Sequence, residues 1–313
     1  MLKYVLVTPA RDEVRFIESA LRSVVAQKVR PLKWVVVSDG STDGTDEVVE
    51  KYCVEYCWIE LIRMPHRMGR DFAGKVHAFN AGYARVKKLQ YDVIGSMDAD
   101  ISFDADYFSF LLGKLAEDSR LGLVGTPFED GSHQTYDYRF TSIEHVSGAC
   151  QLFRRECFEQ IGGYVAVKSG GIDQLAVLAA RMKGWKTRTF TEKVCQHHRE
   201  MGTAVCGGLG ARFRQGIKDY AFGAHPVWEW FRFAYQMTRR PWLLGGLALA
   251  SGYLWAAMQR LERPIPREMV AFRRNEQMLR LKRLLLRNNS RPIADEGFAA
   301  TAGCPSGRNP SLQ

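Results

Sequence analysis

The stretch YDVIGSMDAD, residues 91–100, decides how the rest of the chain is interpreted. Its apolar part predicts a buried strand, and it ends at two carboxylates, Asp98 and Asp100, on either side of Ala99. In open α/β sheets, ligands bind beyond the carboxyl ends of the strands. Carboxylate oxygens at that edge suit a divalent cation that carries phosphates. The alternative is that Asp98 caps a turn and Asp100 is only solvated.

Other predicted strands precede and follow this one, and an apolar-faced helix separates most of them. This alternation predicts an α/β fold with a doubly wound, mostly parallel sheet flanked by helices. The carboxyl ends of parallel strands share one edge, so acidic residues that follow different strands should meet there. The predicted strands are Lys3 to Pro9, Leu32 to Ser38, Trp58 to Met64, the strand that starts at Tyr91, and Leu121 to Phe128, and the acidic residues after them are Asp12, Asp39, Asp98 and Asp100.

A dinucleotide-binding domain is the main competitor for this pattern. It requires a Gly-X-Gly-X-X-Gly turn after the first strand. Here the first turn is Pro9-Ala10-Arg11-Asp12-Glu13, which contains no glycine, and the chain also has no Walker-type phosphate loop. The site must therefore hold phosphate mainly through a metal and donors from the loops.

The composition is that of a globular protein with an unusual charge distribution. The chain has 313 residues, 46% apolar and 25% charged, and a net charge of +10. Residues 211–291 contain 16 Lys and Arg against 5 Asp and Glu, so the excess lies in the carboxyl-terminal third. Seven cysteines without a Cys-X-X-Cys pair indicate a reducing compartment. The amino terminus enters a strand directly, so we expect no signal peptide.

Four motifs occur in a fixed order: TPARDE at 8–13, VSDGSTDGT at 37–45, GKVHAFNAG at 74–82 and DAD at 98–100. Together with later segments they resemble the family-two glycosyltransferases with a GT-A fold, over roughly residues 1–205. The resemblance implies a glycosyltransferase domain at residues 1–210. It also implies a nucleotide-diphosphate sugar as donor, with UDP the expected nucleotide, and Mg²⁺ or Mn²⁺ as the metal.

The resemblance also implies a role for each matched residue. The first loop and Asp39 correspond to the nucleoside pocket, and Lys75 to the nucleotide side of the cleft. Asp98, beside Ala99, would contact the ribose or the metal shell, and Asp100 would coordinate the metal on the diphosphate. The cation would neutralise the charge that builds on the leaving group. The first-loop residues expected in the pocket are Pro9, Ala10, Arg11 and Glu13.

Asp173 is the residue that the resemblance assigns as catalytic base. The family commonly has Glu-Asp at the start of this helix, whereas this chain has Ile172-Asp173. The alternative is that Asp173 is a helix N-cap. A helix dipole would also lower the pKa of this carboxylate and weaken it as a base, unless partial desolvation offsets the effect. The segment from Val146 to Arg155 is predicted to be a strand entering a helix, on the sugar and acceptor side.

Two adjacent histidines and an arginine follow a predicted strand from Lys186 to Val194. The family sometimes has a histidine here that reaches the metal. Adjacent residues at a strand end point to opposite sides, so at most one of His197 and His198 is a ligand, and we expect His198. Arg199 is expected to contact a phosphate. A surface histidine pair is the alternative. Residues 202–210 are glycine-rich and suggest a flap over the nucleotide.

The last third of the chain is basic and aromatic. An uncharged run of 19 residues from Pro241 to Gln259 has arginines on both sides and contains three glycines. It predicts a re-entrant or interfacial helix, with a buried core helix as the alternative. The segment from Arg267 to Arg291 predicts a basic amphipathic helix. Residues 211–291 are thus expected to be a helical membrane-associating region, and residues 292–313 a disordered tail.

The predicted function is that of an inverting glycosyltransferase on the inner, cytoplasmic face of the cell membrane, peripheral or monotopic. Its acceptor would be a glycan or a lipid-linked hydroxyl in cell-surface polysaccharide or glycolipid synthesis. The Trp-rich apolar run favours a membrane over nucleic acid as the partner of the basic region. Two alternatives stay open: a non-catalytic protein that binds nucleotide sugars, and a nucleotidyltransferase on a related sheet.

Overall fold

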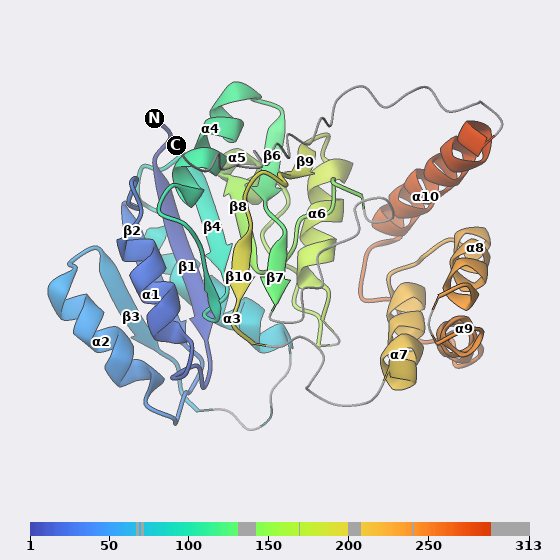
Figure 1. Ribbon diagram of the computed structural model, residues 1–313, viewed down its shortest axis with the longest axis horizontal. Helices are drawn as coiled ribbons and strands as arrows, with labels where there is room; N and C mark the ends of the chain where they lie inside the picture. The colour runs from blue at the N-terminus through green and yellow to red at the C-terminus, as the bar shows by residue number, and fades with distance from the viewer. Residues whose placement is uncertain are drawn as a thin grey trace, which may run out of the picture.

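The computed structural model describes residues 1–66, 69, 72–130, 142–168, 170–199, 208–239 and 241–288. A central sheet with helices on both faces forms the amino-terminal two thirds, and four helices form a separate layer beside it (Figure 1). Residues 202–207 of the predicted flap (residues 202–210) and the predicted disordered tail lie outside the described residues, and residues 208–210 of that flap begin a helix. The main sheet sets the positions of the helices that pack on its two faces.

The main sheet has seven strands in the order β3-β2-β1-β4-β8-β6-β9. Strand β1 lies in the interior of the sheet and pairs in parallel with β2 and β4, as expected for a doubly wound fold. These strands are almost fully buried because helices cover both faces, which explains their continuous apolar runs. The bounds are Tyr4–Ala10 for β1, Lys33–Ser38 for β2, Ile59–Arg63 for β3, Val93–Met97 for β4, Leu121–Gly125 for β6, Cys150–Arg154 for β8 and Lys186–Thr189 for β9.

Strand β8 is the exception in the mostly parallel sheet that the sequence predicted. It lies between β4 and β6 and is antiparallel to both, so the sheet is mixed. Its partner register sets Met97, the last residue of β4, opposite Cys150. The loop that precedes β8 therefore lies at the same edge as Asp98 and Asp100. The helix α5, Arg155–Gln160, follows β8 directly, as predicted.

Two hydrophobic cores fill the space between the sheet and its helices. One core holds the buried faces of α1, α2 and α4, and the other holds those of α3, α5 and α6. The amphipathic helix α1 illustrates the cause, because its buried residues recur at helical spacing and face the sheet. The bounds of these helices are Ile17–Val25 for α1, Thr45–Glu55 for α2, Phe72–Val86 for α3, Tyr107–Glu117 for α4 and Ile172–Met182 for α6.

A second, three-stranded sheet crosses the edge where the carboxyl ends of β1, β2 and β4 meet. Its order is β5-β10-β7, with bounds Ile101–Ser102 for β5, Cys195–His197 for β10 and Phe128–Asp130 for β7. The antiparallel pairing of β10 with β5 sets His197 opposite Ile101. This small sheet brings residues 197–199 beside Asp100, which is almost 100 positions away in the chain.

The four carboxyl-terminal helices are α7 (Gly208–Ala221), α8 (Pro226–Met237), α9 (Leu244–Met258) and α10 (Arg267–Asn288). The uncharged run thus forms α9, and its glycines let neighbouring backbones approach closely. A Cβ at Gly252 would collide with the Phe213 carbonyl of α7, and one at Gly216 with the Leu249 carbonyl of α9. Among the described residues, no helix combines the length and apolarity required to cross a membrane.

Helix α10 joins the four carboxyl-terminal helices to the sheet domain. Its residues Met269 and Val270 pack with Leu175 and Leu178 of α6 and with Phe222. Arg181 of α6 also donates to Glu276 of α10 at 2.9 Å. The carboxyl-terminal helices are therefore joined to the helix that carries Asp173.

Candidate active site

The candidate site lies at the carboxyl edge of the central strands, as the sequence indicates. Ala10 ends β1, Asp39 follows β2, and Asp98 follows β4. Asp39 and Asp100 are buried, whereas Asp98 is partly exposed. Ala99 is buried between the two carboxylates, so its backbone rather than a side chain shapes the turn.

The loops after β1 and β2 are locked together by hydrogen bonds. The backbone of Asp12 is left-handed, with φ of 55°, and its Oδ1 accepts from the Thr42 amide at 2.9 Å. The Glu13 amide donates to Thr45 Oγ1 at 2.8 Å, and the Asp39 amide donates to the Ala10 carbonyl at 2.8 Å. Asp12 therefore links the two loops, and together they form one wall of the site.

Arg11 lies beside Asp39 in this wall. Its guanidinium is 3.8 Å from Asp39 Oδ2 and donates to the Gly69 carbonyl at 2.8 Å. The Asp39 side chain is only 6% exposed, so a ligand could reach its carboxylate only by a close fit. Pro9 and Ala10 hold the start of this loop in the sheet, where they pair with Val37 and Ser38. Arg11 and Asp39 thus present a paired cation and carboxylate in the predicted nucleoside pocket.

Lys75, on α3, forms an ion pair with Asp98 Oδ1. Burial tends to lower the pKa of Lys75, but Asp98, Asp173 and Asp100 together raise it above its ordinary value. Burial also raises the pKa of Asp98; Lys75 opposes this effect and Asp100 reinforces it. The ammonium of Lys75 is therefore the positive charge around which the three predicted catalytic and binding carboxylates gather.

Arg199 connects the first loop to the turn after β4. Its guanidinium forms an ion pair with Glu13, and its Nε lies 3.3 Å from Asp100 Oδ2. Glu13 is buried, so this arginine neutralises a carboxylate that water barely reaches. The structure thus brings together Glu13, Asp100 and Arg199, three residues that the sequence assigned to the nucleotide site.

The structure places His197, rather than His198, beside Asp100. His197 Nε2 lies 3.6 Å from Asp100 Oδ1, and its side chain is buried. His198 is exposed, and its Nε2 lies 2.8 Å from Ser102 Oγ. The two side chains do point to opposite sides, but the pairing of β10 with β5 turns His197 toward the site. The expectation for His198 is therefore revised in favour of His197.

Asp173 stands at the start of α6 but does not cap it. The N-cap is Gly171, with φ of 85°, and no side-chain cap hydrogen bond is formed. The carboxylate instead lies over Gly148, where a Cβ would be 3.0 Å from the Asp173 Cβ. Gly148 therefore leaves the space that Asp173 occupies, and this requirement could not be recognised from the sequence. The side chain remains partly exposed, as a group that meets an acceptor must be.

The donor set fits a divalent metal. His197 Nδ1 lies 2.6 Å from the Arg199 carbonyl, which can only accept, so the proton belongs on Nδ1. The Nε2 lone pair then faces a carboxylate oxygen, an arrangement that a cation between them would stabilise. In the described part of the chain, no three His, Cys, Asp or Glu side chains converge on one metal position. A cation held here would therefore take further ligands from phosphate and water, as Mg²⁺ commonly does.

Fold and site together define a glycosyltransferase of the GT-A type. Residues 5–162 match the model of Glycosyl transferase family 2. The chain belongs to this family and is a glycosyltransferase.

Curated relatives are distant. A poly-β-1,6-N-acetyl-D-glucosamine synthase of Staphylococcus aureus is 26% identical over 172 residues, which are 48% of this chain and 39% of that protein. The synthase of Staphylococcus epidermidis is 21% identical over 240 residues, 69% of this chain and 53% of that protein. The chain therefore spans only part of the length of these relatives.

Solved structures share the fold. A mannosyltransferase of Pyrobaculum calidifontis in complex with GDP-Man and Mn²⁺ aligns with a TM-score of 0.57 and 19% identity, over 93% of this chain and 81% of that one. S. aureus TarS in complex with UDP-GlcNAc aligns with a TM-score of 0.51 and 14% identity, over 82% and 73% of the two chains. The first alignment reaches beyond the sheet domain into the carboxyl-terminal helices.

Proposed function

We propose that this chain is an inverting glycosyltransferase that moves a sugar from a nucleotide-diphosphate sugar to an acceptor hydroxyl. The observation that carries the proposal is the cluster of Asp100, His197, Arg199 and Glu13, tied across three loops beside the Lys75–Asp98 pair. The ligands of the solved relatives support this donor class, because they include GDP-Man with Mn²⁺ and UDP-GlcNAc. A UDP-linked sugar is the first donor to test.

Each side chain of the edge has a part in holding the donor. Asp39 accepts hydrogen bonds from the base or the ribose, while Arg11 fixes the carboxylate. Asp100 and His197 hold a divalent cation, which would offset the charge on the diphosphate leaving group. Arg199 exchanges its contact with Asp100 for one with a phosphate, and its bond to Glu13 keeps it at the edge. Lys75 positions Asp98 toward the nucleotide.

Asp173 acts as the general base. It accepts a proton from the acceptor hydroxyl, whose oxygen attacks the anomeric carbon from the face opposite the diphosphate. The side chain lies against Gly148 at the start of α6 and stays partly exposed, which supports its access to an acceptor hydroxyl.

Binding of a donor panel with and without Mn²⁺ tests this proposal. We expect one nucleotide sugar to bind in the presence of Mn²⁺ and to be hydrolysed slowly, with water as a poor acceptor. A non-catalytic binding protein would bind the donor without turnover, and a nucleotidyltransferase would release pyrophosphate from a nucleoside triphosphate. Either of those outcomes would replace the proposed activity.

We infer further that the acceptor is presented at a membrane surface, on the cytoplasmic side. Helices α8 and α9 and the segment between them expose large apolar side chains, among them Trp230, Trp242, Leu247 and Met258. Arginines line the same layer, including Arg239. Exposed aromatic side chains next to basic residues suit the headgroup region of an anionic leaflet. The chain would then lie on the membrane and bring its acceptor edge close to lipid.

Vesicle flotation tests the membrane contact. We expect the protein to float with vesicles that contain phosphatidylglycerol and to stay in solution with phosphatidylcholine alone. Changing Trp230 and Trp242 to Ser should abolish flotation. The control is Val54→Ser on α2, since Val54 is 90% exposed but lies in the sheet domain. If the tryptophan variant floats like the parent, this contact is wrong.

A further inference from the structure

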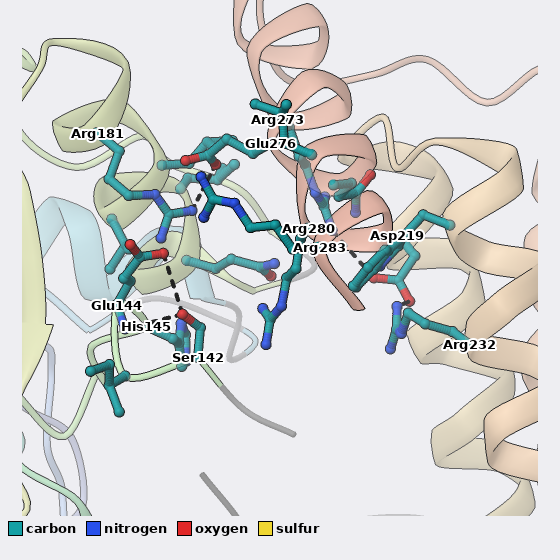
Figure 2. A pocket seen from close by; sticks show the side chains of 18 of the residues that line it. Ser142, Glu144, His145, Arg181, Asp219, Arg232, Arg273, Glu276, Arg280 and Arg283 are labelled. Carbon is teal, nitrogen blue, oxygen red and sulfur yellow. Dashed lines mark hydrogen bonds and ion pairs between the residues drawn. The ribbon is translucent and has the colours of Figure 1, made fainter. Parts of the chain in front are cut away.

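A cavity of about 820 Å³ lies between the sheet domain and the carboxyl-terminal helices. Its walls come from α6, α7, α8 and α10 and from residues 142–145 before β8. Figure 2 shows the long side chains of Arg181, Arg280 and Arg283 extending into this space, with Asp219 and Arg232 on the opposite wall. The cavity is separate from the Asp98–Asp100 edge and has no part in donor binding.

One face of α10 supplies most of the polar wall. Arg273, Gln277, Arg280 and Arg283 follow each other at intervals of three or four residues, so they project from the same side of the helix. Leu284, by contrast, is exposed and does not line the cavity. The sequence spacing alone therefore explains why a basic helix presents an arginine row to this space.

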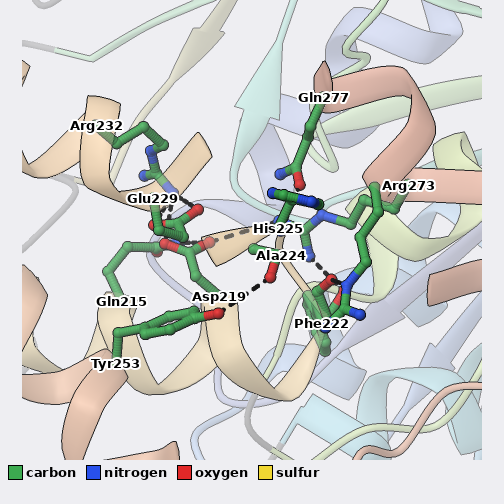
Figure 3. Close-up of polar contacts among 12 residues, drawn as sticks. Gln215, Asp219, Phe222, Ala224, His225, Glu229, Arg232, Tyr253, Arg273 and Gln277 are labelled. Atoms are coloured by element: carbon green, nitrogen blue, oxygen red, sulfur yellow. Dashed lines mark hydrogen bonds and ion pairs between the residues drawn. The ribbon is translucent and has the colours of Figure 1, made fainter. Parts of the chain in front are cut away.

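The cavity carries more positive than negative charge. Its lining contains five arginines and three carboxylates. Asp219 is engaged with Arg232 at 2.5 Å and with Arg273 at 3.5 Å, and Glu276 accepts from Arg181 at 2.9 Å (Figure 3 shows the Asp219 network). These contacts fix three of the five guanidinium groups in place, and Glu229, behind the lining, also bonds Arg232 at 3.1 Å. The arginines of the lining still outnumber the carboxylates around them.

The surplus charge is concentrated where α6 faces α10. Burial lowers the pKa of Arg280; Glu144 opposes this effect, whereas the charge of Arg181 adds to it. The Arg280 guanidinium also lies 5.8 Å from the centre of the Trp228 ring. Arg181 and Arg280 both line the cavity, so an anion that enters it would meet two guanidinium groups beside an aromatic ring.

The cavity reaches the acceptor side of the active site. Gln174, which lines it, follows Asp173 directly on α6. His145 also lines the cavity. Burial lowers the pKa of this histidine, and the negative charge of Asp173 opposes that effect. A molecule that fills the cavity would therefore extend toward the base rather than toward the nucleotide.

We propose that this cavity binds a phosphate group of the acceptor, with Arg181, Arg280 and Arg283 as its donors. The assignment of the ligand as acceptor rests on the proposed glycosyl transfer; the anion site itself does not. Leu178 and Leu279 also line the cavity, so a phosphate attached to an alkyl chain could fill it. A phosphate attached to a polyol is the other source of the same chemistry.

Calorimetric titration of the full chain at low ionic strength tests the site. The probes are inorganic phosphate, hexyl phosphate and glycerol 3-phosphate. We expect at least one of the two phosphate esters to bind more tightly than inorganic phosphate, and the tighter ester identifies the source. Arg280→Gln should weaken binding by about tenfold or more, because a charge-assisted hydrogen bond is lost. Arg283→Gln, at an exposed position that does not support the fold, should also weaken it.

Two further variants are controls for nonspecific attraction to the basic helix and for binding at the donor edge. Lys282→Gln removes the same charge from α10 at an exposed position outside the cavity and should leave binding unchanged. Arg199→Gln should also leave it unchanged, since it changes the donor edge. The proposal would be overturned if Lys282→Gln weakened phosphate binding as much as Arg280→Gln, or if Arg199→Gln weakened it at all. It would also be overturned if Arg280→Gln and Arg283→Gln bound the probes like the parent, or if no probe bound. If phosphate esters bind here but no nucleotide sugar binds at the edge, the proposed function fails and the anion site stands.

Discussion

The sheet edge and the cavity beside α10 hold charges of opposite sign. At the edge, four carboxylates (Glu13, Asp39, Asp98 and Asp100) meet three cationic side chains (Arg11, Lys75 and Arg199). In the cavity, five arginines meet three carboxylates. An acidic edge suits a cation that carries a diphosphate, and a basic cavity suits an anion. The comparison indicates that the acidic edge serves the donor, whereas α6, which carries Asp173 and lines the cavity, serves the acceptor.

The largest expected effect comes from Asp173, which lies between the two regions. Asp173→Asn should lower metal-dependent donor turnover by about 10²–10⁴-fold, because the amide cannot take the acceptor proton. Donor affinity, measured by calorimetry, should stay within about twofold, since the edge is unchanged. Asp104→Asn, a highly exposed carboxylate, is the matched control. Unchanged turnover in Asp173→Asn would remove this residue as the base and separate the two regions functionally.

The next effect tests which histidine belongs to the acidic edge. His197→Ala and Asp100→Asn should each weaken Mn²⁺ binding in the presence of nucleoside diphosphate by about 10- to 100-fold. His198→Ala should bind Mn²⁺ like the parent, because its ring lies against Ser102. Electron paramagnetic resonance of free Mn²⁺ gives the affinity directly. A loss in His198→Ala alone would restore the prediction from the sequence and contradict the geometry of β10.

The third prediction concerns the packing of α9 against α7 in the carboxyl-terminal helices, and it leaves the sheet edge unchanged. Gly252→Leu should force α9 away from α7, because any side chain at this position meets the Phe213 carbonyl. We expect a loss of about 1–3 kcal/mol in the free energy of unfolding. Gly113→Ala on α4 is the control, since a Cβ there meets nothing within 4 Å and should slightly stabilise the helix. Equal stability of Gly252→Leu and the parent would show that the close helix contact is not required.

The smallest expected effect is a pH dependence of stability at Glu229, which bonds the cavity residue Arg232. Glu229 is fully buried, and burial with the nearby Asp219 raises its pKa from 4.5 to about 7, although Arg232 opposes the rise. Between these pH values the folded chain keeps a proton that the unfolded chain has lost. The free energy of unfolding should therefore fall as the pH rises from about 4.5 to about 7, by about 1–3 kcal/mol.

Glu229→Gln tests this assignment by chemical denaturation across the same pH range. The amide cannot ionise, so the slope should flatten, while Arg232 keeps its bond to Asp219. A slope that persists in Glu229→Gln would place the titration elsewhere. A slope of opposite sign in the parent would contradict the raised pKa.

Much of the edge could be predicted because it depends on strand order alone. An apolar run that ends in carboxylates, as at Asp98, fixes both the strand and the end at which ligands bind. The same argument placed Asp39 correctly. The strand β8 could be predicted but its antiparallel direction could not, since a buried strand has the same apolar pattern in either direction.

The remaining parts of the site depend on contacts between distant residues. Whether His197 or His198 faces Asp100 is set by the register of β10 on β5, and one residue of shift exchanges the two. The uncharged run with its glycines suggested a re-entrant or interfacial helix, but Gly245 and Gly252 are the positions where α7 packs, and Gly246 is where α8 packs. The cavity between α6 and α10 arises only when the two parts of the chain are joined.

The central claim is that the acidic edge holds a nucleotide sugar through a divalent cation. Calorimetric titration of UDP-linked and GDP-linked sugars into the full chain, with and without Mn²⁺, tests it most directly. We predict that one donor binds in the presence of Mn²⁺ and that Asp100→Asn abolishes this gain. Binding of equal affinity without Mn²⁺, or no binding by any nucleotide sugar, would contradict the claim.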